Sequence, residues 1–348
     1  MKRIDHIRGL GLLVLVCGLA IGSSPVHPRP APQPAEGVFV RVVDTGPGLC
    51  AVVRMPGPLF MVYDAGDFTA SGSSRCFEGI SEVIPEDSPI ELLVLSHSDA
   101  DHLGAVDRIL DRHRVKRILH GGMVRSTTTW RNADAAINRE RDSEGALDIN
   151  LKQVEFPPGA TYRLGEVFAT MLSGFHEPPA GWDIQNESER RNAGSIVIRL
   201  KYRNRAILFA GDAVGRHIDD PSDKLIATEK FVVEMSEVLP VQADVLIVPH
   251  HGADNGSSEA FIRAVNPTFV VFSAGHKHQH PRASAAQRYI ANGIPVNRMF
   301  RTDLGDDEGS KEWSHGRVAG HSDPVGDDDV DILIRPDGSV EVKYRQTP

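Results

Sequence analysis

The sequence predicts an α/β fold with two β-sheets, and three of its features support this expectation. Its 348 residues are 41% hydrophobic and 24% charged, which is the composition of an ordinary globular protein. Short apolar runs that suit buried strands alternate with segments of helical periodicity. After a proline-rich stretch near the N-terminus, about 310 residues continue without a second linker or an internal repeat, a length that a two-sheet α/β domain accommodates.

Residues 1–22 have the features of a signal peptide for export. Lys2, Arg3 and Arg8 give a positively charged start, and an apolar run follows up to residue 21. This run is shorter than the roughly 20 residues that a membrane-spanning helix needs. We therefore expect cleavage before Ser23, with retention as an anchor as the alternative, and a periplasmic or extracellular mature protein without a stable membrane span.

The remaining chain divides into a proline-rich linker over residues 23–36 and one domain over residues 37–348. The domain contains Cys50 and Cys76, which can pair in an oxidising compartment. We expect one structural disulfide between them, and two buried free thiols are the alternative.

The apolar runs and their periodicities define the expected elements in chain order. Strands are predicted at residues 38–43, 51–54, 59–63, 90–95, 196–200, 206–210, 245–248 and 269–272. Helices are predicted near 103–110 and 231–239, from 257–258 onward, and over 283–292 with Gly293 as the stop. A solvated acidic loop at 305–331, with a surface calcium site as the alternative, precedes a hairpin of residues 330–335 and 339–344.

Four of the predicted strands end next to residues that commonly bind metal ions. In α/β sheets, ligand sites gather just beyond the carboxyl ends of strands. Four separate strands that bring Asp or His to such an edge therefore indicate a metal site. The residues are Asp64, His97, Asp212, and the pair His250 and His251.

The segment from His97 to His102 is the richest in candidate ligands. His97, Asp99 and Asp101 alternate with small residues, so an extended segment would direct all three side chains the same way. An acidic helix N-terminus is the simpler alternative, but it leaves the two flanking histidines unexplained. As a site, the segment would serve two adjacent divalent cations, with Asp212 as the bridge and one of the two later histidines completing the ligand set.

These motifs, in this order, resemble the metallo-β-lactamase superfamily, and within it the soluble hydrolase domain of the competence DNA-uptake protein ComEC. The matching segments are 96–104, 192–197, 210–213, 248–252, 257–258, 273–275, 280–281 and 302–305. The resemblance implies an αββα sandwich with a metal site at the shared edge of the two sheets. It also implies the ligands His97, Asp99, Asp101, His102, Asp212 and His250, with His251 as a less certain second-shell or substrate-facing partner and Asp64 orienting the 97–102 loop from beneath.

Two positions depart from the β-lactamases proper. Asp99 stands where those enzymes have a second histidine, and residues 192–195 contain no third histidine. The first metal site is therefore richer in oxygen donors and poorer in nitrogen donors. Harder ligands favour Mn²⁺ or Mg²⁺ more than an all-histidine set would, and zinc remains an alternative.

Other polar residues near the predicted strand ends are candidates for contacting a substrate. Free N–H groups at the helix expected from 257–258 onward suit an anionic oxygen. His280 is expected to contact the substrate or to donate a proton to the leaving group, with Asp101 as the second catalytic residue. His276 and His278 are interpreted as rim residues. The expected substrate contacts are Asn192, Asn255, Ser257, Ser258, Lys277 and Arg282.

The combined features predict an exported, metal-dependent hydrolase that acts on a phosphodiester, in DNA or a nucleotide, through a metal-activated hydroxide. Two divalent cations, zinc or manganese, are the expected cofactors. The net charge of −9 argues against nonspecific binding of polyanions, but bound cations would reverse the charge locally. Hydrolysis of an ester, lactone or β-lactam is one alternative, and a non-catalytic, metal-stabilised binding module is another. No protein partner is predicted.

Overall fold

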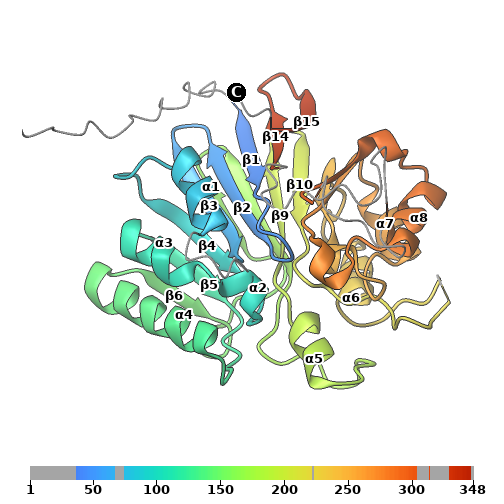
Figure 1. Cartoon of the computed structure of the whole chain (residues 1–348), viewed down its shortest axis with the longest axis horizontal. Helices are drawn as coiled ribbons and strands as arrows, with labels where there is room; N and C mark the ends of the chain where they lie inside the picture. The colour runs from blue at the N-terminus through green and yellow to red at the C-terminus, as the bar shows by residue number, and fades with distance from the viewer. Residues whose placement is uncertain (1–36, 67–73, 222, 304–312, 314–328, 346–348) are drawn as a thin grey trace, which may run out of the picture. The chain divides into compact units, whose positions relative to one another are not determined.

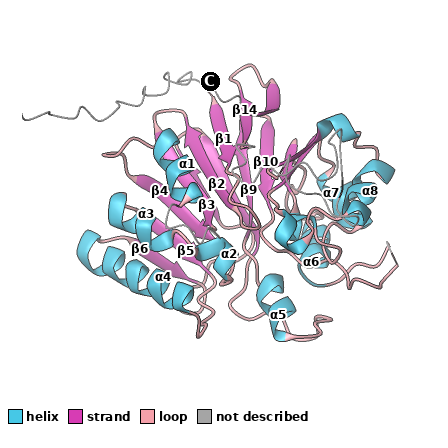
Figure 2. Ribbon diagram, viewed as in Figure 1, coloured by secondary structure: helices cyan, strands magenta, loops and turns pink. Residues whose placement is uncertain are grey.

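Residues 34–348 form one compact unit, of which the computed structural model describes residues 37–66, 74–221, 223–303, 313 and 329–345. Two β-sheets pack face to face, and helices cover the outer side of each sheet (Figures 1 and 2). This four-layer arrangement confirms the predicted αββα sandwich. The expected signal peptide, the linker and most of the acidic loop lie outside the described residues.

The first sheet has eight strands. From one edge to the other they are β15 (Val340–Tyr344), β14 (Val330–Ile334), β1 (Val38–Val42), β2 (Cys50–Met55), β3 (Leu59–Ala65), β4 (Ile90–Leu95), β5 (Arg117–His120) and β6 (Leu147–Asn150). Neighbours are antiparallel from β15 to β3 and parallel from β3 to β6. The predicted C-terminal hairpin is therefore present as β14 and β15, and it extends the sheet beyond β1.

The second sheet has seven strands. In spatial order they are β13 (Met299–Arg301), β12 (Phe269–Phe272), β11 (Val245–Ile247), β10 (Arg205–Phe209), β9 (Val197–Tyr202), β8 (Val167–Ser173) and β7 (Thr161–Leu164). β10 to β13 are parallel, and β7 to β10 are antiparallel. Each sheet therefore has a parallel half, and the parallel strands deliver their carboxyl ends to one edge.

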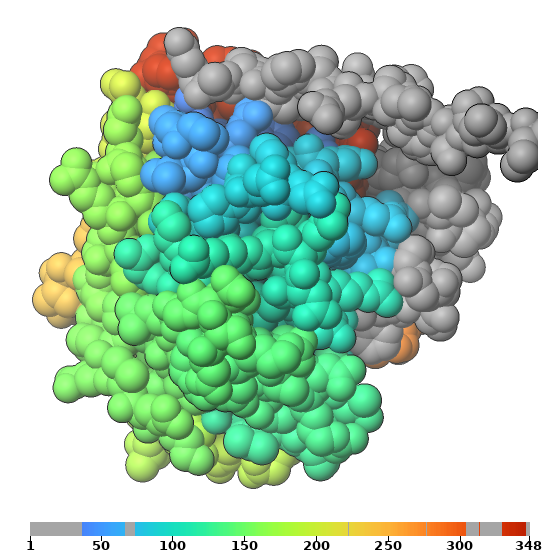
Figure 3. Space-filling model, turned by 90° about the vertical axis from the view of Figure 1, so that its left-hand side faces the viewer, coloured from blue at the N-terminus to red at the C-terminus, as the bar shows by residue number. Residues whose placement is uncertain are grey.

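Helices pack on the outer side of both sheets. The first sheet is covered by α1 (Arg75–Val83), α3 (Val106–Arg112) and α4 (Thr128–Arg139), and the colours of this part of the chain, cyan to green, occupy the centre of the face seen in Figure 3. The second is covered by α6 (Ala227–Met235), α7 (Glu259–Val265) and α8 (Ala283–Ala291). The short helices are α2 (Ala100–Leu103), α5 (Glu187–Ala193), η1 (Glu140–Glu144), η2 (Pro249–Gly252), η3 (His276–His278) and η4 (Val296–Arg298). Among the described helices, none combines the length and the hydropathy needed to cross a bilayer.

The main core lies between the two sheets, where alternate residues of facing strands interdigitate. Tyr63 of β3 and Phe209 of β10 stack across it with ring centroids 5.0 Å apart, an arrangement that adds roughly 1 kcal/mol to simple burial. The Tyr63 hydroxyl donates to the Ile196 carbonyl at 2.6 Å. This contact fixes the distance between the sheets close to the edge where the candidate ligands lie.

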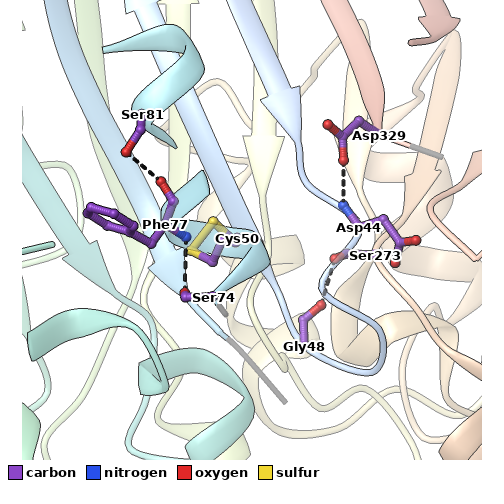
Figure 4. Close-up of a disulfide and its surroundings, with 9 residues drawn as sticks. Asp44, Gly48, Cys50, Ser74, Phe77, Ser81, Ser273 and Asp329 are labelled. Carbon is purple, nitrogen blue, oxygen red and sulfur yellow. Dashed lines mark hydrogen bonds between the residues drawn. A yellow bond between two sulfur atoms is a disulfide. The ribbon is translucent and has the colours of Figure 1, made fainter. Parts of the chain in front are cut away.

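The predicted disulfide between Cys50 and Cys76 is present and joins the start of β2 to α1. Figure 4 shows that it lies beside the N-terminus of α1, where the Ser74 hydroxyl accepts the Phe77 N–H at 3.1 Å. The bridge closes a 26-residue separation. In the chain-entropy treatment, closing a loop of this size stabilises the folded state by about 3 kcal/mol.

Two predicted helices have different bounds in the structure. The helix expected at 103–110 is divided into α2 and α3, because the Ala105 N–H donates to the Ala65 carbonyl of β3 at 2.8 Å instead of continuing the helix. The helix expected at 231–239 begins earlier, at Ala227, and ends at Met235. The apolar residues beyond Met235 continue in turns rather than in the helix.

Candidate metal centre

The candidate ligands lie at the edge where strands of both sheets end. Asp64 lies at the end of β3, His97 follows β4, Asp212 follows β10, and His250 and His251 follow β11. α2 and α5 lie at the same edge, below the strands in Figure 1. The topology therefore brings together the residues that the sequence places at the ends of separate strands.

Asp101, His102, His251 and Asp212 converge on one point. The two Nε2 atoms of His102 and His251 are 3.2 Å apart. Asp212 Oδ1 lies 3.1 Å from His102 Nε2 and 3.4 Å from His251 Nε2. Asp101 Oδ2 lies 4.0 Å from His251 Nε2. Asp101, His102 and His251 thus form one group of potential ligand atoms, and Asp212 Oδ1 approaches the two imidazoles of this group.

The hydrogen bonds on the far side of the two rings assign their tautomers. His102 Nδ1 is 2.7 Å from Asp64 Oδ2, and His251 Nδ1 is 2.6 Å from the Ser273 carbonyl, so both Nδ1 atoms must donate. The Ser273 hydroxyl in turn donates to the Gly48 carbonyl (Figure 4). In neutral imidazoles, both Nε2 lone pairs then face each other. A positive charge is needed between them, and this donor set, with its second hydrogen-bonded shell, fits a divalent cation.

Asp212 also belongs to a second group, with His97 and His102. Its Oδ2 atom lies 3.6 Å from Nε2 of His97 and 3.6 Å from Nε2 of His250. His97 Nε2 is buried and has no hydrogen-bond partner among the described residues. A buried lone pair without a partner is costly unless it binds something. Asp212 therefore lies between two candidate positions for a cation, as expected for a bridging ligand.

The electrostatics of the site favour the ionisation states of metal ligands. Burial alone would raise the pKa of Asp212, but the surrounding imidazoles, His102 foremost, hold it well below its usual range. Burial lowers the pKa of His97 and of His251, which keeps both rings neutral. Burial opposes a charge on His102 too, yet Asp212 and Asp64 raise its pKa well above the usual value. In the absence of a metal ion, a proton on His102 supplies the positive charge that the site attracts.

Asp64 positions the ligand-bearing loop, as the resemblance implied. This fully buried carboxylate accepts the Ser96 N–H at 2.6 Å, the Ser96 hydroxyl at 2.7 Å and His102 Nδ1 at 2.7 Å. The neighbouring backbone is equally constrained, because a Cβ atom on Gly66 would lie 1.8 Å from the Asp101 carbonyl oxygen. The sequence Asp64-Ala65-Gly66, where β3 ends, thus contacts both Asp101 and His102.

The structure reverses the expected order of the two later histidines. His251, treated as the less certain partner, lies in the group described above. His250 approaches Asp212, but its Nδ1 is 2.6 Å from Asn255 Oδ1 and its Nε2 is 3.3 Å from Asn192 Nδ2. Both histidines have left-handed backbone conformations, with φ of 50° and 55°, and this kink directs the two rings to different partners. Asn192 and Asn255 therefore contact His250.

Asp99 departs from the expected arrangement. Its Oδ1 accepts Arg191 Nε at 2.7 Å and is also paired with Arg125 Nη1. Burial opposes its ionisation, but His97 and the two arginines lower its pKa. The alternating pattern does not extend through the segment, because Asp99 is the N-cap of α2 and Asp101 is already helical. The three side chains therefore do not point the same way, and neither ligand group includes Asp99.

The expected anion site at Ser257 and Ser258 is wrong, because the chain fills it itself. The Glu229 carboxylate of α6 accepts both backbone N–H groups, at 2.6 Å and 2.8 Å. All three residues have no exposed surface. Burial raises the pKa of Glu229 to about 7, against the effect of these hydrogen bonds. These N–H groups consequently organise the 254–258 loop and do not face a substrate.

The residues after β12 flank the site without entering the ligand groups. The His280 ring lies 6.2 Å from the His250 ring. Burial, together with the neighbouring His250, His251 and Arg282, lowers the pKa of His280 to about 2. A neutral His280 has no extra proton to give, so this low pKa argues against the expected role as a general acid. Lys277 and His278 are exposed, and Arg282 is partly buried beside them.

Sequence reasoning did not single out Arg125, Arg191 or Glu229. Each is a charged residue outside any recognised motif, and its hydrogen-bond partner lies 26 to 92 residues away in the sequence. Only the folded topology brings them to the site.

Comparisons with known proteins agree with this geometry. The family model described as metallo-beta-lactamase superfamily matches residues 43–276. Competence protein ComA of Neisseria gonorrhoeae is 26% identical over 321 residues, which cover 89% of this chain and 37% of the relative. ComE operon protein 3 of Bacillus subtilis is 26% identical over 218 residues, covering 62% of this chain and 24% of the relative. The chain thus spans less than two fifths of the length of either relative.

Among solved structures, the metallo-beta-lactamase fold protein YhfI from Bacillus subtilis matches with a TM-score of 0.44 and 12% identity. The match covers 76% of this chain and 97% of that structure.

Proposed function

The chain belongs to the metallo-beta-lactamase superfamily, and from this premise we propose that it hydrolyses phosphodiester bonds with a pair of divalent cations. The superfamily consists typically of metal-dependent hydrolases, and the buried His and Asp groups fit that chemistry. Bound cations would supply Lewis acidity towards a phosphoryl oxygen and a water of lowered pKa.

The observation that carries the proposal is the placement of Asp212 between two sets of imidazole nitrogens. Its Oδ1 faces His102 and His251, and its Oδ2 faces His97. This placement would let Asp212 be shared by two cations held close together, and such a pair would stabilise the attacking and the leaving oxygen of a phosphoryl group. Asp64 contributes by fixing the His102 tautomer, so that the Nε2 lone pair points into the site.

Two features favour a phosphodiester over a lactam. Asp99 stands where the β-lactamases proper have a second histidine, and residues 192–195 contain no third one, so the site has fewer nitrogen donors and is harder than that of a β-lactamase. The relative from Neisseria gonorrhoeae is named a competence protein, which supports a nucleic acid or a nucleotide as the substrate class. We propose Mn²⁺ or Zn²⁺ as the cofactor, with Mn²⁺ at least as effective.

We further propose that the protein acts outside the cytoplasm. The charged and apolar pattern of residues 1–22 supports export. The Cys50–Cys76 disulfide is consistent with an oxidising compartment. Mass spectrometry of the protein from fractionated cells tests both parts, since an intact Met1 in the cytosol would contradict the proposal.

The test of the activity uses metal-free protein reconstituted with Mn²⁺, Zn²⁺ or Mg²⁺. Turnover is measured on bis(p-nitrophenyl) phosphate, single-stranded DNA, a lactone and a β-lactam, with bound metal determined in parallel. We expect phosphodiester turnover that is lost in Asp212→Asn and kept in Asp134→Asn, a change at an exposed residue of α4. Turnover of the lactone or the β-lactam without any phosphodiester turnover would contradict the proposed substrate class.

A further inference from the structure

Two arginines from separate elements converge on one carboxylate beside the metal centre. Arg125 lies in the loop between β5 and α4, and Arg191 lies in α5. Both donate to the same Asp99 oxygen, Oδ1. Arg191 also donates from Nη1 to the Glu187 carbonyl at 2.8 Å, which fixes its guanidinium against α5. The two guanidinium groups are therefore held in defined positions.

This arrangement leaves an excess of positive charge. Among the described residues, neither Arg125 nor Arg191 has an ion pair other than the one with Asp99. One arginine would neutralise Asp99, so the second adds about one unit of net positive charge. Their side chains are 25% and 17% exposed, which leaves N–H donors within reach of a ligand. A planar guanidinium with free donors is the group best suited to a phosphate.

The pair lies next to the ligand groups and outside them. Asp99 is two residues from both His97 and Asp101, so its Cα atom is within about 7 Å of theirs. A narrow cavity whose lining includes His97 and Arg191 has a volume of about 10 Å³, which is roughly the space of one water molecule. A sugar or a base cannot enter it, and a ligand of the arginines must lie across the surface of the site.

We propose that Arg125 and Arg191 form a second anion subsite, which binds a phosphate next to the scissile phosphate of a polynucleotide chain. Asp99 pairs with both guanidinium groups and so keeps them away from the cation positions. This inference rests on the proposed function and deepens it. A polynucleotide carries such a neighbouring phosphate, whereas a simple diester does not. The subsite therefore distinguishes a chain from an isolated phosphodiester.

The test separates binding from turnover. Binding of a fluorescein-labelled oligothymidylate to metal-free protein is measured by anisotropy over a range of salt concentrations. The proteins are wild type, Arg125→Gln, Arg191→Gln, the double variant, and the control Arg190→Gln, which removes an α5 arginine that pairs with Glu187. Arg125→Met and Arg191→Met also remove the charge and replace any Gln variant that does not fold. Bound metal is also determined for each reconstituted protein.

We expect the double variant to bind at least tenfold more weakly. Its slope of log affinity against log salt should decrease by about 1.4, because each contact to a single strand contributes roughly 0.7. Arg190→Gln should change neither quantity. In turnover, the double variant should lose at least tenfold more kcat/KM on the oligonucleotide than on the dinucleotide TpT, mainly through a higher KM. A 5′- or 3′-phosphate added to TpT should make its turnover depend on the two arginines again.

Unchanged binding and salt slope in the double variant would overturn the subsite. So would an equal loss of turnover on TpT and on the oligonucleotide accompanied by loss of bound metal, because the arginines would then only orient Asp99. Arginine-dependent binding by a protein that hydrolyses no phosphodiester would keep the subsite and reject the proposed activity.

Discussion

The buried carboxylate of Glu229 should make the stability of the folded protein depend on pH. Its two oxygens accept the Ser257 and Ser258 N–H groups inside the α6–α7 contact, without solvent access. Burial raises its pKa from 4.5 to about 7. Such a group is protonated in the folded state over a pH range in which the unfolded chain has already lost the proton.

The sign and the size of the effect follow from this difference. Below pH 4.5 both states bind the proton, so stability does not depend on Glu229. As the pH rises from there towards 7, the unfolded chain releases its proton while the folded state keeps it, so deprotonation increasingly favours the unfolded state. The free energy of unfolding should therefore fall by about 3 kcal/mol across this window, at about 1.4 kcal/mol for each pH unit.

Glu229→Gln removes the titration while it keeps the shape of the side chain. Its amide oxygen can accept one of the two N–H groups, so we expect a loss of about 1–3 kcal/mol at pH 4.5 from the unsatisfied donor. Between pH 4.5 and 8 the wild type should lose stability and approach the variant. The control Glu234→Gln lies on the exposed side of the same helix and should follow the wild type.

Four proteins are compared: the wild type, Glu229→Gln, Glu234→Gln and the double variant. Denaturant unfolding at half-unit pH steps measures the free energy of unfolding of each. Subtracting the free energy of unfolding of the Glu229→Gln variant from that of the wild type at each pH cancels the contributions of the other titrating groups. If the wild-type and Glu229→Gln curves stay parallel from pH 4.5 to 8, Glu229 does not retain its proton in the folded state, and the reasoning from burial is wrong.

Four further predictions concern the site and the disulfide. Asp212→Asn should reduce bound metal and abolish turnover, because both cations lose a shared ligand; full metal content with normal turnover would contradict this. Asp64→Asn should lower metal affinity about 10- to 100-fold, since an amide N–H facing His102 Nδ1 favours the wrong tautomer, and isothermal titration measures it. Metal affinity of the wild type should fall as the pH is lowered, because the raised pKa of His102 makes a proton compete with the cation. Replacing Cys50 and Cys76 together with Ser should cost about 3 kcal/mol in denaturant unfolding, and an unchanged midpoint would show that the bridge is dispensable.

The sequence predicts the elements whose residues are uniformly buried and misses those in which buried and exposed residues are mixed. β4 and β12 were predicted residue by residue, because a strand covered on both faces is a continuous apolar run. β7 and β8 were missed, since exposed and buried residues are mixed along them and Phe168 is 41% exposed. α4 was missed as well, because two of its four buried residues are alanines, Ala133 and Ala136, which give little contrast in hydropathy.

The same distinction applies to the metal centre. Residue types at strand ends predicted the edge where the candidate ligands meet, because topology alone brings strand ends together, whereas Asp99 pairs with two arginines instead of joining them. The choice between His250 and His251 depends on two successive left-handed residues. Hydropathy and motif spacing do not report backbone φ, so the sequence left this choice open.

Three buried carboxylates show why residue type alone does not decide a role. Asp64, Asp212 and Glu229 are all shielded from solvent. Asp64 meets a backbone N–H, a hydroxyl and an imidazole N–H, so it is saturated and positions the loop. Glu229 is saturated by two backbone N–H groups and organises another loop.

Asp212 differs because the groups around its oxygens are imidazole nitrogens that offer lone pairs. Two lone pairs and a carboxylate cannot satisfy one another, and only a cation or a proton resolves the conflict. The ligand is thus identified by an imbalance between donors and acceptors. This imbalance becomes visible once the hydrogen bonds of His102 Nδ1 and His251 Nδ1 are known, and it is the physical reason for placing the metal centre here.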